Sequence, residues 1–127
     1  MVLGCKMATA RDLRFPKSRR LKLPSEFERV RKEGRAERGK LLIVSVLAAQ
    51  DRHRLRAGFV TSKRVGSAVV RNRIRRRLRE IVRKYQQDLL EDLWLVTIAR
   101  PAAANASYRE LEDEWLRLAK RAFILAN

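Results

Sequence analysis

Cysteine and histidine are almost absent from this 127-residue chain, which contains only Cys5 and His53. A single copy cannot form an internal disulfide, a Cys/His zinc site or a catalytic pair of histidines. No apolar run approaches the ~18 residues that a membrane-spanning helix requires. The sequence therefore predicts a cytoplasmic protein that makes no contact with a membrane and binds no metal ion by itself.

Acidic residues are scarce in the first two-thirds of the chain. Residues 1–79 contain 24 Lys/Arg and only 6 Asp/Glu, whereas residues 80–127 contain 7 and 8, and the whole chain carries a net charge of +17. Charge of one sign at this density indicates a polyanionic partner. An apolar content of 46% excludes a disordered basic tail. We expect the first two-thirds to bind nucleic acid and the last third to act as scaffold.

The stretch from Thr61 to Lys84 carries the strongest signal, with 10 Lys/Arg and a single acid, Glu80. At about 3.6 residues per turn its apolar residues fall on one arc of a helix predicted from Ser67 to Tyr85. Gly66 permits a tight turn before this helix, and Ser67 is a suitable N-cap. A solvated basic face is the alternative interpretation. The one-signed charge on a well-formed amphipathic helix favours the binding of a polyanion, because like charges at i,i+4 destabilise a helix unless a partner neutralises them.

The arginines of this helix are predicted to occupy two faces. Arg71 falls within the apolar arc near the helix start, where it would overhang the edge of a sheet and point into a groove. Arg73, Arg76 and Arg79 are expected on the outer face. Asn72 is either a solvated polar residue or an amide that hydrogen-bonds a base edge or a phosphate.

The N-terminal region divides at about residue 24. Residues 1–23 lack periodicity and are predicted to form a flexible basic arm, with residues 24–127 as one domain. Ser25 and Glu28 have the spacing of a capping box that starts a first helix, which ends near Gly34. Phe27 in this helix is either a core anchor or an aromatic residue lining a groove for single-stranded nucleic acid.

The remaining segments predict an α+β fold, a single mixed sheet with helices packed on it. The continuous apolar run 40–49 is typical of a central strand. The alternating segment 54–62 is expected to pair with it through a hairpin turn at residues 50–53. A short extra strand is expected at 35–38 and another strand at 93–100. Ser107 and Glu110 form a second capping box before the last helix.

The segment SKRVGSAVVRNRIRRRLRE resembles the protein subunit of bacterial ribonuclease P. The likeness rests on the turn Lys63-Arg64-Val65-Gly66 and the box Arg71-Asn72-Arg73, and is supported by FPKSRRL, SEFERVRKEGR and the strand that ends at Pro101. Two positions depart from the family pattern, since Arg31 and Ser45 stand where aromatic residues are expected.

The resemblance implies an αβββαβα order with a left-handed β-α-β crossover. It implies an accessory subunit of an RNA-based endonuclease, whose large catalytic RNA removes the 5′ leader from precursor tRNA. Mg²⁺ would be bound through the RNA partner, and the chain would contribute no catalytic residue. Its partners would be the catalytic RNA subunit and precursor tRNA, with no obligate protein partner.

The predicted site residues, taken from the charge pattern and from this resemblance, form two groups. The expected RNA-binding residues are Lys63, Arg64, Arg71, Asn72, Arg73, Arg75, Arg76, Arg77, Arg79 and Arg83. The expected groove for the leader contains Phe27, Arg31, Ser45, Arg56 and Ser62. The alternative function is that of a ribosomal or other structural RNA-binding protein. A self-sufficient nuclease is disfavoured because the basic region lacks the carboxylate or histidine pairs that such enzymes use.

Overall fold

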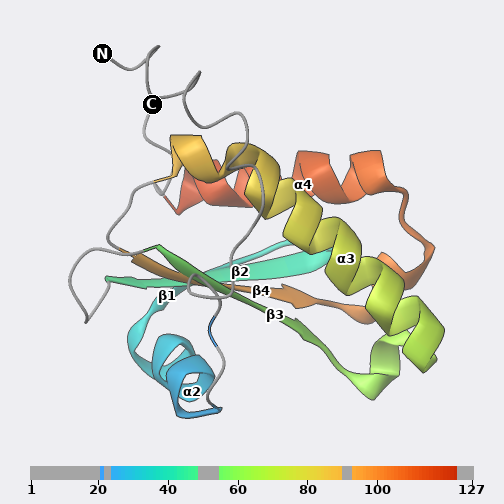
Figure 1. Cartoon of the computed structure of the whole chain (residues 1–127), viewed down its shortest axis with the longest axis horizontal. Helices are drawn as coiled ribbons and strands as arrows, with labels where there is room; N and C mark the ends of the chain where they lie inside the picture. Colours follow the sequence, from blue (N-terminus) through green and yellow to red (C-terminus); the bar gives the residue numbers. More distant parts are fainter. Residues whose placement is uncertain (1–20, 22–23, 49–54, 90–92, 123–127) are drawn as a thin grey trace.

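The computed structural model describes residues 21, 24–48, 55–89 and 93–122. Residues 1–20 and 22–23 of the predicted arm and the predicted turn at 50–53 lie outside the described residues. The described chain forms one four-stranded mixed sheet, with helices α3 and α4 on one face and helix α2 on the other (Figure 1). The predicted α+β class and αβββαβα order are confirmed.

The described elements follow one another as α2 (Pro24–Glu33), β1 (Arg35–Arg38), β2 (Leu42–Ala48), β3 (Arg56–Thr61), α3 (Ala68–Tyr85), β4 (Leu93–Ala99) and α4 (Tyr108–Arg121). Three short 3₁₀ segments lie between them: η3 (Lys63–Val65), η4 (Gln86–Asp88) and η5 (Pro101–Asn105). The short extra strand expected at 35–38 is therefore present as β1.

The strand order is β1-β2-β4-β3, so the predicted pairing of β2 with β3 is wrong. Strand β4 lies between them, antiparallel to β2 and parallel to β3. The physical reason is burial. The first five residues of β4, Leu93–Thr97, are all buried, and a strand buried on both faces belongs inside the sheet. Helix α3 connects the parallel pair β3 and β4, as the resemblance implies. The hand of this crossover stays a prediction.

Local capping determines where two of the helices begin. The Ser67 hydroxyl accepts a hydrogen bond from the Val70 N–H at 3.4 Å, which confirms the predicted N-cap of α3. Gly66 has φ 152°, a backbone conformation that favours glycine. At α4, Ser107 and Glu110 make both bonds of the predicted capping box, at 3.1 and 2.8 Å.

The capping box predicted at Ser25 and Glu28 is wrong. Helix α2 already begins at Pro24, so Ser25 lies inside its first turn. Proline is well tolerated there, because the first N–H groups of a helix have no intrahelical partner. Glu28 instead accepts a hydrogen bond from Arg31 at 3.0 Å and pairs with Lys32 at 3.6 Å.

The sheet separates two hydrophobic clusters. The larger lies between the sheet and helices α3 and α4, and includes the fully buried Ile74, Leu78 and Trp115. The smaller lies beneath α2 and consists of Leu21, Val30, Trp94 and Val96, with Phe27, Leu47, Val60 and Ile98 packed against it. Strands β2, β3 and β4 contribute alternate residues to the two sides, as the two-residue period of a strand requires.

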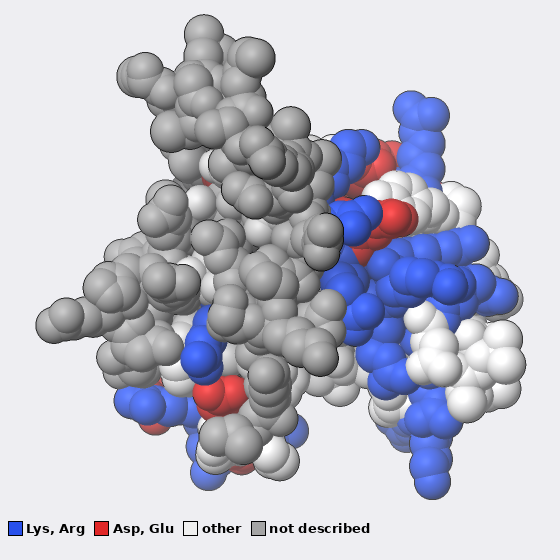
Figure 2. Space-filling model, in the orientation of Figure 1, with Lys and Arg blue, Asp and Glu red and all other residues white. Residues whose placement is uncertain are grey.

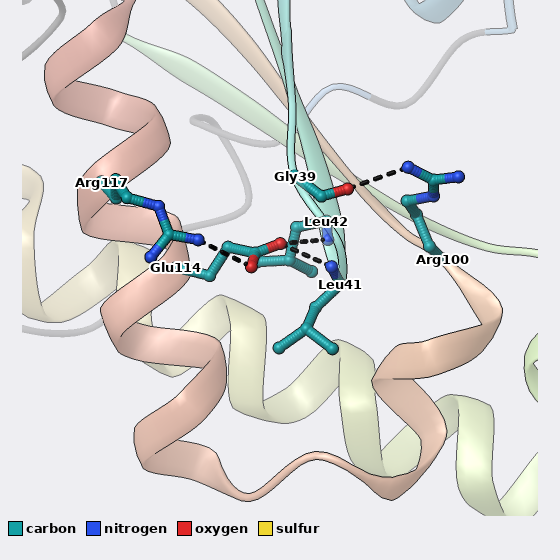
Figure 3. A network of polar contacts seen from close by, with 6 residues as sticks. All are labelled: Gly39, Leu41, Leu42, Arg100, Glu114 and Arg117. Carbon is teal, nitrogen blue, oxygen red and sulfur yellow. Dashed lines mark hydrogen bonds and ion pairs between the residues drawn. The ribbon is translucent and has the colours of Figure 1, made fainter.

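A buried carboxylate ties α4 to the start of β2 (Figure 3). Glu114 accepts hydrogen bonds from the N–H groups of Leu41 and Leu42 at 2.6 and 2.8 Å, and its other oxygen accepts one from Arg117 at 3.0 Å. From the opposite side of the same turn, Arg100 donates to the Gly39 carbonyl at 2.9 Å. The turn between β1 and β2 is thus held by a residue of α4 and by the residue that follows β4.

No helix among the described residues is long and apolar enough to cross a membrane.

Candidate nucleic-acid interface

Lysine and arginine side chains gather over helix α3 and form a continuous basic surface (Figure 2). The buried face of α3, which includes Ile74, Leu78, Ile81 and Val82, lies against the sheet. The cations therefore project from the sides and the outer face of the helix. Glu80 is the only acid in α3. The contacts of the individual arginines divide this basic surface into three parts.

The first part is the side of α3 that faces η5. Arg73 donates a hydrogen bond to the Ala104 carbonyl at 3.4 Å, and Arg77 donates to the Ala106 carbonyl at 3.2 Å. Both arginine side chains are half-buried. The prediction that Arg73 lies on the outer face is therefore wrong. The loop from Pro101 to Ala106 lies beside the helix and supplies carbonyl acceptors to that side.

The second part is the side that faces β3. The guanidinium carbon of Arg79 lies 6.0 Å from the centre of the Phe59 ring, within the range of a cation–π contact. The outer-face prediction for Arg79 is therefore also wrong. The predictions for Arg73 and Arg79 fail for the same reason. The apolar arc covers less than half of the helix circumference, so arginines beside that arc reach η5 on one side and β3 on the other.

The third part is the outer face, where Asn72, Arg76 and Glu80 are exposed. The Asn72 side-chain oxygen accepts a hydrogen bond from Arg75, and Glu80 accepts one from Arg83 at 3.2 Å. Arg76 is predicted on this face and is exposed there. Lys63 and Arg64, in η3 just before the helix, are exposed as well. This part presents the cations that are most accessible to a polyanion.

The C-terminal end of α3 is held to α4 by a polar cluster around Glu112. Lys84 Nζ lies 2.8 Å and the Tyr85 hydroxyl 2.6 Å from the same Glu112 oxygen. The hydrogen bonds from Lys84 and Tyr85 hold the pKa of Glu112 below its ordinary value of 4.5. The hydrogen bond to Glu112 likewise raises the pKa of Tyr85. The Tyr85 ring also stacks on Trp115, with centroids 6.1 Å apart, so this end of the basic helix is fixed on the scaffold.

A hollow of about 390 Å³ opens on the other face of the sheet, beside α2. Val60, Val96 and Ile98 provide an apolar floor from strands β3 and β4. The described residues that complete its lining are Pro24, Phe27, Glu28, Arg31 and Ser45. Helix α2 and three strands from distant parts of the sequence therefore build one concave, mainly apolar surface.

Three of the five residues predicted for the leader groove line this hollow, namely Phe27, Arg31 and Ser45. Arg56 and Ser62 do not belong to its described lining. Arg56 lies on the same face but forms an ion pair with Glu26 at 2.9 Å, and Ser62 is exposed after the end of β3. Arg71, predicted to point into the groove, is half-buried on α3 and is not part of that lining.

Phe27 both packs on a hydrophobic cluster and lines the hollow, and its contact with nucleic acid stays a prediction. Its ring is partly buried and packs on the smaller hydrophobic cluster. The same ring lines the hollow. Arg31 stands where the family pattern has an aromatic residue, and it forms an ion pair with Glu28 at 3.0 Å while its side chain stays 70% exposed. The hollow thus has one aromatic wall and one cationic rim.

Several residues of the two surfaces were not among the predicted site residues. Val60, Val96 and Ile98 form the floor of the hollow, and strand alternation could have placed Val60 there, since it shares a face with Arg56 and Gly58. Val69 is 74% exposed on α3, the most exposed large hydrophobic residue of the described chain. Its position outside the apolar arc of the helix could have predicted this exposure. Nothing in the sequence indicated that carbonyl groups of η5 accept hydrogen bonds from arginines of α3.

Among the described residues, no group of three or more His, Cys, Asp or Glu side chains is arranged to hold a metal ion.

The family model described as Ribonuclease P matches residues 15–123. The ribonuclease P protein component of Chloroflexus aurantiacus is 44% identical over 107 residues, which cover 84% of this chain and 78% of that protein. Its counterpart from Roseiflexus castenholzii is 42% identical over 108 residues and covers 84% of this chain and 87% of that protein.

Solved structures show the same fold. The Staphylococcus aureus RNase P protein aligns with a TM-score of 0.80 at 26% identity, over 86% of this chain and 99% of that one. The Thermotoga maritima RNase P protein aligns with a TM-score of 0.72 at 25% identity, over 80% and 96% of the two chains. The matched residues 15–123 include the basic helix, its preceding turn and the sheet that carries them, and the chain belongs to the bacterial ribonuclease P protein family.

Proposed function

We propose that this member of the bacterial ribonuclease P protein family acts with a catalytic RNA subunit to remove the 5′ leader from precursor tRNA. Membership of the family carries this proposal, because that membership implies an RNA partner and a role in tRNA processing. The chain supplies positioning and charge, and the RNA supplies the catalytic groups. The cytoplasm, where tRNA precursors are made in bacteria, is the compartment that this role requires.

The outer face of α3 binds the catalytic RNA in this proposal. RNA carries one phosphate per nucleotide, and cations that neutralise phosphates release the counterions condensed on them. The exposed Arg76, together with Lys63 and Arg64 before the helix, offers positive charge without a carboxylate partner in the described chain. Arg71, Asn72 and Arg75 extend the same surface toward the start of the helix.

The hollow beside α2 receives the single-stranded leader. Its apolar floor and the Phe27 ring suit the faces of unpaired bases, which stack on aromatic side chains with little dependence on sequence. Arg31 at the rim can contact a phosphate or lie over a base. Since Arg31 is already paired with Glu28, a phosphate must compete with that carboxylate.

Mg²⁺ is held by the RNA partner in this proposal. The described residues provide no carboxylate cluster that fits such an ion, so no metal site is assigned to this chain. The contribution of the protein is to neutralise phosphates close to the RNA. That lowers the electrostatic cost of folding the RNA and allows its own metal sites to fill at lower Mg²⁺ concentration.

The experiment compares two neighbouring cations of α2. Arg31 and Lys32 have side chains 70% and 72% exposed, and both pair with Glu28, but only Arg31 lines the hollow. We expect Arg31→Ala to weaken the binding of leader-bearing precursor more than that of mature tRNA to the reconstituted ribonucleoprotein. Lys32→Ala should change both affinities equally and slightly. The same reduction for both variants and both ligands would show that the hollow has no special relation to the leader.

The alternative of a structural RNA-binding protein without a catalytic partner is tested by cleavage. The isolated protein should cleave no RNA, and addition of its catalytic RNA should give cleavage at the 5′ end of mature tRNA. Absence of any effect of the protein on that cleavage, across Mg²⁺ concentrations, would contradict the proposal.

A further inference from the structure

The position of the Phe27 ring depends on a glycine of the opposite strand. Gly58 is buried on β3 and faces α2 between Arg56 and Val60, because side chains alternate along a strand. A β-carbon built at Gly58 would lie 2.6 Å from Cζ of Phe27 and 3.3 Å from Cβ of Leu21. Two carbon atoms do not approach to 2.6 Å without repulsion. The tip of the ring therefore occupies the space that any other residue at position 58 would fill.

The surroundings leave the ring one direction in which to move. Buried residues of the smaller cluster, including Val30 and Trp94, pack around it. Leu21 closes another side, and its N–H donates to the Ala57 carbonyl at 2.9 Å, next to Gly58. The ring also borders the hollow, where there is open space.

An ion pair keeps helix α2 from moving away from strand β3. Glu26 of α2 and Arg56 of β3 are 2.9 Å apart, with side chains only 15% and 29% exposed. This contact lies one residue before Phe27 on the helix and two residues before Gly58 on the strand. It holds α2 against β3 where the ring meets the glycine. A side chain at position 58 is thus accommodated by rotation of the ring rather than by displacement of α2.

We propose that Gly58 is a positioning residue for the leader groove. Its missing side chain lets the tip of the Phe27 ring rest on the backbone of β3, which keeps the hollow above Val60 and Ile98 open for a base. This inference rests on the proposed binding of the leader in the hollow. Gly58 touches no RNA and acts through Phe27 alone.

The test substitutes a single methyl group. Gly58→Ala should turn the Phe27 ring into the hollow, and new nuclear Overhauser contacts between the ring and the methyl groups of Val60 and Ile98 should report it in the free protein. In the reconstituted ribonucleoprotein, the preference for leader-bearing precursor over mature tRNA should fall about tenfold, the order of one lost base stack.

Gly39→Ala is the matched control. A β-carbon at Gly39 would lie 2.7 Å from the carboxyl carbon of Glu114, a collision of similar severity near the start of β2. We expect this variant to be less stable than the wild type but to keep its leader preference. Equal preferences in Gly58→Ala and the wild type, measured where both are fully folded, would overturn the inference. Equal losses in both glycine variants would overturn it as well, because they would reflect general destabilisation.

The double variant Phe27→Leu/Gly58→Ala covers the case in which Gly58→Ala does not fold. Leucine lacks the ring tip that the new methyl group meets, so Gly58→Ala should cost little stability when Phe27→Leu is already present. If the methyl group destabilises both backgrounds equally, its obstacle is not the ring, and the inference fails.

If the hollow does not bind the leader, the measurements would differ from those expected when only the role of Gly58 is wrong. In that case the wild type and Phe27→Ala would bind leader-bearing and mature tRNA with the same ratio of affinities. The ring displacement in the free protein would still decide whether Gly58 positions Phe27.

Discussion

Arg73 and Arg77 are expected to stabilise the folded domain, whereas Arg76, between them in sequence, is expected to serve RNA binding alone. The first two donate to carbonyl groups of Ala104 and Ala106 from half-buried positions, and Arg76 is exposed. All three are arginines of the same helix within five residues. Substitution by alanine therefore compares two roles within one surface.

The structure gives the magnitude for each variant. A hydrogen bond from a charged group contributes about 1.5–3 kcal/mol at good geometry. The N···O distances of 3.4 and 3.2 Å are long. We therefore expect about 1 kcal/mol from each bond, and a loss of about 2 kcal/mol in unfolding free energy for Arg73→Ala/Arg77→Ala. An exposed substitution such as Arg76→Ala should change the unfolding free energy by less than about 0.5 kcal/mol.

RNA titrations at several salt concentrations give the second measurement. Wild-type affinity should fall steeply with salt, because the plot of log K against log salt has a slope of about −0.7 to −0.9 per phosphate neutralised. Arg76→Ala should reduce the magnitude of that slope by about one such unit while urea unfolding stays unchanged. The double variant should lose stability in urea, and its RNA affinity should be compared only under conditions where it is folded.

This division of roles among the three arginines is refuted if Arg73→Ala/Arg77→Ala unfolds at the same urea concentration as the wild type. It is equally refuted if Arg76→Ala loses as much stability as the double variant. The first result would mean that the contacts with η5 contribute nothing to stability, and the second that Arg76 contributes as much to stability as Arg73 and Arg77 together.

Two further predictions concern the scaffold. Glu114→Ala leaves the N–H groups of Leu41 and Leu42 without their acceptor, so the unfolding free energy should fall by about 3 kcal/mol. Asp113 is an exposed neighbour, and Asp113→Ala should change the unfolding free energy by less than about 0.5 kcal/mol. Equal effects of the two substitutions in urea unfolding would contradict the stabilising role of Glu114. Glu112 has a lowered pKa in the folded state, so its contribution to stability is complete above about pH 4.5 and is lost as the pH falls through the folded-state value. The stability difference between wild type and Glu112→Gln should therefore shrink over that acidic range in unfolding measurements, and a difference that does not depend on pH would exclude a charged interaction with Lys84.

The sequence by itself determined the local features of this protein. The arc of apolar residues from Val70 to Tyr85, the N-cap Ser67 and the turn glycine Gly66 are properties of neighbouring residues, so helix α3 could be predicted nearly to its ends. The family motif around Arg71-Asn72-Arg73 lies in the same continuous segment. Residues close in sequence carried these signals, and no contact with another part of the chain was needed to interpret them.

Only the tertiary structure decided which segments lie side by side. The alternation of apolar residues shows the faces of a strand but not its partner, so the insertion of β4 between β2 and β3 could not be predicted. The hollow is lined by α2 and by strands from three distant segments of the chain. Ile98 lines it because β4 lies directly beside β3. Tertiary contacts also decided which arginines of α3 are held by other elements and which are exposed. Arg73 and Arg77 differ from Arg76 because η5, about thirty residues later in the chain, folds back along one side of α3.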